Sequence, residues 1–110
     1  MINAKEELME HIRNRENWKS MSLSTLCEKV ELVRIALRGY SGGYHNIEGS
    51  LNHVLPLLDF EYDGGYGGQY LYGYIWYADG TWSERGEYDG SEWWVHKEKP
   101  KKDIKISGSW

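Results

Sequence analysis

The chain has 110 residues and a net charge of −4 at pH 7, which suits one domain with a modest core. Hydrophobic residues make up 40% and charged residues 27%, ordinary values for a globular protein. No apolar run approaches the roughly 18 residues of a membrane span, and the charged N-terminus lacks the apolar stretch of a signal peptide. Cys27 is the single cysteine, so no intramolecular disulfide can form and a reducing cytoplasm is expected.

The charge is distributed unevenly along the chain. Residues 1–58 are neutral, residues 59–94 carry eight acids against Arg85 alone, and residues 95–110 have a net charge of +3. Phosphate backbones are bound by clustered Lys and Arg, so direct nucleic-acid binding is not expected. An acidic segment instead favours a basic protein partner, such as a protein that handles nucleic acids.

Apolar spacing predicts two or three helices in the first half of the chain. The first is expected over residues 4–18. The second has the clearest pattern, with apolar residues at helical spacing and Gly39 at its end. Its stripe consists of Leu26, Val30, Val33 and Leu37. A third helix over residues 46–56 is left open, because Pro56 would break it.

The second half of the chain has the pattern of a β-meander. Asp-Gly occurs at 63–64, 79–80 and 89–90, between runs rich in Tyr and Trp, and such dipeptides are typical of hairpin turns. Four strands are expected, over residues 58–62, 69–77, 81–88 and 91–97.

The expected fold is therefore α+β, formed by a single domain over residues 1–100. Helices from residues 1–58 would pack on one face of a four-stranded antiparallel meander over residues 59–97. The lysine-rich residues 101–110 would form a flexible tail.

Two-residue turns at Asp79-Gly80 and Asp89-Gly90 would fix which side chains face solvent. The outward set would consist of Tyr72, Tyr74, Trp76, Arg85, Glu87, Glu92, Trp94 and His96. The inward set would consist of Leu71, Ile75, Tyr77, Trp82, Glu84, Tyr88, Trp93 and Val95. Glu84 would then pair with a helix arginine, Arg34 or Arg38. A one-residue bulge would exchange the two faces.

A patch of large rings around one guanidinium is the best candidate site, because a monomer gains little by leaving it in water. The candidate binding residues are Tyr72, Tyr74, Trp76, Arg85, Glu87, Trp94 and His96. The alternative is that these rings only stabilise the sheet through cross-strand pairs and a cation–π contact of Arg85.

Motifs for catalysis are missing from the sequence. It has no nucleophile motif, phosphate loop or metal-ligand spacing, and His45 and His53 are weak evidence for a metal site. Cys27 lies on the apolar stripe and is expected to be buried. We therefore expect no enzyme activity, cofactor or metal.

The segments Asp79-Gly80-Thr81-Trp82 and 87–94, EYDGSEWW, resemble the C-terminal part of small proteins encoded by tailed phages and prophages. The resemblance spans about a third of the chain and implies an accessory protein in the cytoplasm of the bacterial host. Such proteins often bind and inhibit host or defence proteins. The resemblance transfers no activity and no site residue.

The expected function is thus non-catalytic binding of a bacterial host protein through the aromatic, acidic sheet surface. The alternative is a small-ligand or glycan module that uses the same aromatic face. The sequence also leaves a homodimer open.

Overall fold

The computed structural model describes residues 1–15, 18–39, 43–63 and 68–99. A five-stranded antiparallel sheet has the strand order β3-β2-β5-β6-β7. Its strands are β2 (Val30–Arg38), β3 (Tyr44–Gly49), β5 (Leu71–Tyr77), β6 (Trp82–Tyr88) and β7 (Ser91–Lys97). A second, two-stranded sheet joins β1 (Ile2–Asn3) to β4 (Glu61–Tyr62).

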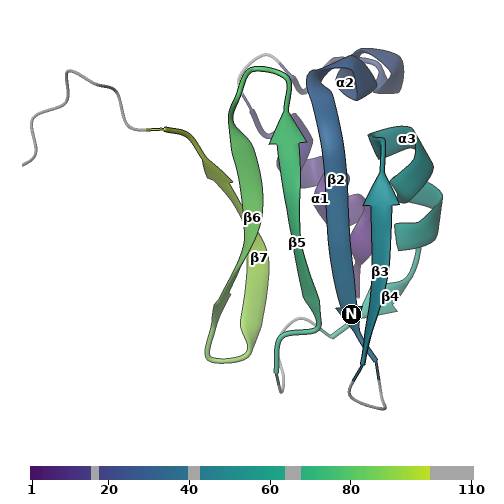
Figure 1. Ribbon diagram of the computed structural model, residues 1–110, viewed down its shortest axis with the longest axis vertical. Helices are drawn as coiled ribbons and strands as arrows, with labels where there is room; N and C mark the ends of the chain where they lie inside the picture. The colour runs from purple at the N-terminus through teal and green to yellow at the C-terminus, as the bar shows by residue number, and fades with distance from the viewer. Residues whose placement is uncertain (16–17, 40–42, 64–67, 100–110) are drawn as a thin grey trace, which may run out of the picture.

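The helices are α1 (Ala4–Arg13), α2 (Leu23–Lys29), α3 (Leu51–Val54) and the 3-10 helix η1 (Leu55–Leu58). In Figure 1, α1 and α3 lie behind the sheet, and the face toward the viewer carries neither. The core lies between the helices and the sheet, with Leu8, Ile12, Val33 and Ile75 fully buried. The α+β class is confirmed, and α1 and α3 lie on one face of the main sheet.

The first helix forms where the sequence predicts it but ends earlier, at Arg13. Asn3 caps it by accepting a hydrogen bond from the backbone N–H of Glu6. Ala4, Leu8 and Ile12 recur every four residues and are buried, so one narrow stripe attaches the helix to the sheet.

The predicted long second helix is wrong. Only Leu23–Lys29 is helical, and Val30–Arg38 forms the interior strand β2, which lies between β3 and β5. The strand pairing is irregular between Val30 and Leu32, so the buried residues Val30 and Val33 are three positions apart. After Val33 every second residue is buried, at Ile35 and Leu37. A bulged strand therefore imitates a helical stripe. The β-branched residues in this segment favour the strand.

The division into a helical half and a sheet half is also wrong. Residues 44–49 form the edge strand β3, so the region left open over 46–56 is part strand and part helix. The strand expected over 58–62 shortens to β4 and pairs with β1 outside the main sheet. The four-stranded meander is replaced by a meander of three strands, β5-β6-β7, extended by β2 and β3.

The two described Asp-Gly turns differ. Asp89-Gly90 is the expected two-residue turn, since Tyr88 pairs with Ser91 and both turn residues have positive φ, 51° and 86°. At the other turn Trp76 pairs with Trp82, and the Tyr77 N–H donates to the Thr81 carbonyl at 3.0 Å. Three residues, 78–80, therefore form the loop, with Gly80 at φ 87°.

This three-residue loop shifts β6 by one position against β5. Tyr74, rather than Ile75, is the partner of Glu84. The faces of β6 and β7 are therefore exchanged relative to the predicted register. Gly64 of the expected turn at 63–64 and the lysine-rich tail over 101–110 lie outside the described residues.

Candidate binding surface on the open face of the sheet

We call the side of the main sheet opposite α1 the open face. Strand pairing defines it, because directly opposite residues share a face. One row runs Glu48, Arg34, Tyr74, Glu84, Val95, and the next runs Asn46, Ala36, Tyr72. Leu32, Trp76, Trp82 and Lys97 form a further row.

The open face exposes large rings at its centre and along its β7 edge. Tyr74 is 45% exposed and Trp93 is 42% exposed, while Trp76 and Trp82 are half-buried. Tyr74 and Trp76 stack with their ring centroids 5.4 Å apart. Within the described residues no helix covers these rings, so they are available to a partner.

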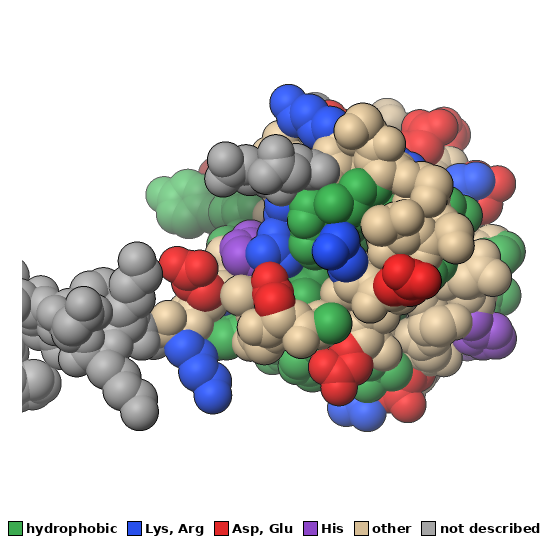
Figure 2. Space-filling view, turned by 90° about the horizontal axis from the view of Figure 1, so that it is seen from above, with side chains coloured by type: hydrophobic (Ala, Val, Ile, Leu, Met, Phe, Trp, Pro, Cys, Tyr) green, Lys and Arg blue, Asp and Glu red, His purple; other side chains and the backbone are tan. Residues whose placement is uncertain are grey.

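The charge of the open face is mixed. Arg34 and Glu48 form an ion pair between exposed side chains, and Glu84 accepts a hydrogen bond from the Trp82 indole at 3.2 Å. Arg38 and Lys97 add positive charge at the margins. Figure 2, a view from above, likewise shows acidic and basic side chains interspersed at that end of the molecule.

The structure divides the predicted site between the two faces of the sheet. Tyr72, Tyr74 and Trp76 lie on the open face, as predicted. Placing Arg85, Glu92, Trp94 and His96 on the same face is wrong, because the three-residue loop turns them toward α1. Glu87 belongs to this inner side too, but it lies near the exposed hairpin end and accepts from the Gly90 N–H.

Arg85 forms a buried polar network in place of a solvent-exposed stack. Its Nη2 lies 2.7 Å from Glu92 Oε1 and 2.9 Å from the Tyr62 hydroxyl, and its Nη1 lies 3.2 Å from Glu7 Oε1. Burial lowers the pKa of Arg85, but the neighbouring carboxylates outweigh burial and the net shift is upward. The guanidinium therefore stays charged and joins α1 and β4 to the sheet.

A second polar cluster lies beneath the sheet between α1 and β6. His11 Nε2 lies 2.7 Å from Ser83 Oγ, which also shares a hydrogen bond of 2.8 Å with the Tyr77 hydroxyl. Burial lowers the pKa of His11 to about 4, and neighbouring basic side chains add to the shift. Ser83 is fully buried, so its hydroxyl cannot reach a substrate and this cluster has a structural role.

The predicted inward positions of Glu84 and Trp93 are also wrong. Glu84 lies on the open face and does not pair inward with Arg34 or Arg38. Trp93 lies on the open face over Gly86, where an added Cβ would be 3.1 Å from its indole nitrogen. Both errors follow from the single register shift.

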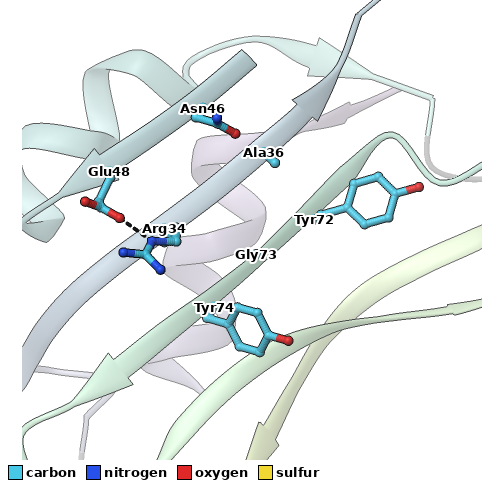
Figure 3. A pocket seen from close by; sticks show the side chains of 7 residues that line it. All are labelled: Arg34, Ala36, Asn46, Glu48, Tyr72, Gly73 and Tyr74. Carbon is cyan, nitrogen blue, oxygen red and sulfur yellow. Dashed lines mark hydrogen bonds and ion pairs between the residues drawn. The ribbon is translucent and has the colours of Figure 1, made fainter. Parts of the chain in front are cut away.

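A hollow of about 390 Å³ opens on the open face over β3, β2 and β5. Figure 3 shows Arg34, Asn46 and Glu48 on one side of it and the rings of Tyr72 and Tyr74 on the other. Sequence reasoning missed the first three residues because Arg34 was expected in a helix and the region 46–56 was left open as a possible helix. The alternation of polar and apolar residues after Val33 was the available signal.

No protein-family model matches the chain, and no curated protein or solved structure matches it. Within the described residues no cluster of three or more His, Cys, Asp and Glu side chains could hold a metal ion. Across the same part of the chain, no helix has the length and apolar character to cross a membrane.

Proposed function

We propose that this protein is a non-catalytic binding protein that binds another protein through the open face of its sheet. The observation that carries the proposal is the set of rings left uncovered there. Trp76, Trp82 and Trp93 occupy neighbouring strands, with Tyr74 stacked on Trp76. Tryptophan and tyrosine are the residue types that most often carry interface energy.

The charge of the open face suits a partner without strong charge. The acidic residues that make residues 59–94 so negative lie mainly elsewhere, with Glu92 buried and Asp79 in a turn paired with Arg15. Charge steering toward a basic partner, as the sequence suggests, therefore has little support on this face. Ring contacts and shape complementarity would supply most of the affinity.

The resemblance to small phage and prophage proteins extends the proposal to the identity of the partner. It favours a bacterial host or defence protein, bound and inhibited in the host cytoplasm. This part of the proposal rests on the resemblance alone.

The test is capture of a partner by matched variants. Immobilised wild-type protein, Trp82→Ala/Trp93→Ala and the control Tyr88→Ala would be exposed to bacterial lysate, and bound proteins would be identified by mass spectrometry. Tyr88 is 77% exposed but lies at the hairpin end of β6, so Tyr88→Ala removes a ring without altering the centre of the face.

We expect a protein that wild type and Tyr88→Ala retain equally and that the double variant loses at least tenfold, since hot-spot truncations cost about 2 kcal/mol or more. The melting temperature of the double variant should stay close to that of Tyr88→Ala. Retention of the partner by a folded double variant would refute the proposed surface.

A further inference from the structure

The hollow on the open face has an apolar floor and one polar wall. Ala36 lies at the centre of a row, opposite Asn46 on β3 and Tyr72 on β5. The methyl group of Ala36 leaves a gap between these longer side chains. Gly73 lies between the two tyrosines along β5 and contributes backbone to the lining of the hollow.

The polar wall carries both hydrogen-bond donors and acceptors. Asn46 offers an amide N–H₂ and a carbonyl oxygen. Arg34 donates through Nε to Glu48, and its two terminal nitrogens remain as further donors. Tyr72 and Tyr74 add ring surface and hydroxyl groups on the opposite side.

The ion pair excludes ligands of strong charge. An anion drawn to Arg34 would also meet the Glu48 carboxylate, and a cation drawn to Glu48 would meet the guanidinium. A neutral ligand with hydroxyl groups can bond to both members of the pair and to Asn46. If it also has an apolar face, it can pack on the tyrosine rings, which have an apolar body and a polar tip.

From this combination we propose that the hollow binds a neutral sugar ring. Its hydroxyl groups bond to Asn46, Arg34 and Glu48, and its C–H face packs against Tyr72 or Tyr74. The volume of about 390 Å³ lies within the range of small-ligand pockets. This site goes beyond the protein-binding function. It shares Tyr74 with that surface, but the two proposals can be tested separately because Trp82 on β6 and Trp93 on β7 do not line the hollow.

The test is an NMR titration of ¹⁵N-labelled protein. The neutral probes are glucose, galactose, mannose and N-acetylglucosamine, and the charged probes are glucuronate, inorganic phosphate and agmatine. For at least one neutral sugar we expect amide shifts confined to residues around Ala36, Asn46 and Gly73, with a dissociation constant on the order of 1 mM, as small neutral ligands allow.

Two pocket variants and one control make the result specific. Ala36→Leu fills the hollow from its floor and Asn46→Ala removes the amide, so each should weaken sugar binding at least tenfold while the melting temperature stays near that of wild type. The control, Trp93→Ala, should bind the sugar as wild type does, even if it loses a protein partner.

The titration has three outcomes that would overturn the proposal. They are no shifts with any neutral sugar, shifts with agmatine or phosphate alone, and unchanged sugar binding by folded Ala36→Leu. The protein-binding proposal is judged separately, because its test depends on Trp82 and Trp93. A loss of sugar binding with intact partner capture, or the reverse, therefore identifies which proposal has failed.

Discussion

Arg85 and Glu92 form an ion pair on neighbouring strands, with Nη2 and Oε1 2.7 Å apart and side chains only 1% and 0% exposed. Glu92 also accepts hydrogen bonds from the backbone N–H groups of Tyr70 and Leu71, at 2.7 and 2.9 Å. The described β5–β6 pairing spans only Tyr74–Trp76. The carboxylate therefore satisfies donors near the start of β5, where that pairing is absent.

Arg85→Ala should destabilise the protein strongly, because it leaves the Glu92 carboxylate buried without its partner. We expect a loss of about 3–5 kcal/mol in the free energy of unfolding, measured by urea denaturation. The control is Arg34→Ala, which breaks an ion pair whose side chains are 59% and 49% exposed and should cost about 1 kcal/mol or less. Equal losses in the two variants would contradict the buried network.

Replacing both partners should not restore stability in this case. Many buried ion pairs can be exchanged for apolar residues at little cost. Here Arg85→Met/Glu92→Leu would leave the backbone N–H groups of Tyr70 and Leu71 unpaired, at about 1–3 kcal/mol for each group. A double variant as stable as wild type would show that those two backbone contacts contribute little.

The pKa of His11 predicts a loss of stability in mild acid. Its pKa falls from 6.5 to about 4 on folding, so between these values the unfolded chain binds a proton that the folded protein excludes. The resulting loss in the free energy of unfolding is absent above pH 6.5 and grows as the pH falls toward 4. With allowance for solvent screening it should reach roughly 1–2 kcal/mol. Burial also lowers the pKa of His96, so the two histidines act on stability in the same direction.

The measurement is the free energy of unfolding of wild type and His11→Gln at several values between pH 7.5 and 4.5. The difference between the two proteins should shrink or reverse as the pH falls, because the variant lacks this proton linkage. His45→Gln, at an exposed position, is the control and should follow wild type throughout. Parallel profiles for wild type and His11→Gln would contradict the assignment.

Local patterns in the sequence predict much of the sheet but not its order. The strands β5, β6 and β7 and the turn at Asp89-Gly90 follow from alternation and turn chemistry. The nature of β2 does not, because its bulge gives Leu26, Val30, Val33 and Leu37 a spacing that also fits a helix. The prediction that these four residues are buried is correct, but Val30, Val33 and Leu37 belong to strand β2 and not to a helix.

The length of the turn at Asp79-Gly80 determines which side chains of β6 and β7 belong to the candidate site. A turn of two or three residues at Asp79-Gly80 fits the sequence equally well, since both use glycine with positive φ. The choice determines whether Arg85 and Trp94 face solvent or α1. Burying Trp94 and the Arg85 network beneath α1 favours the three-residue loop, and that is a tertiary contact that local patterns do not encode.

The binding surface requires Trp93 and Trp94 to point to opposite faces of β7, with exposures of 42% and 7%. The most direct test is ¹⁹F NMR of protein labelled with 5-fluorotryptophan, with signals assigned by single Trp→Phe variants. Adding a soluble gadolinium chelate should broaden the Trp93 signal strongly and leave the Trp94 signal sharp. A broadened Trp94 signal beside a sharp Trp93 signal would restore the two-residue turn and contradict the open face described here.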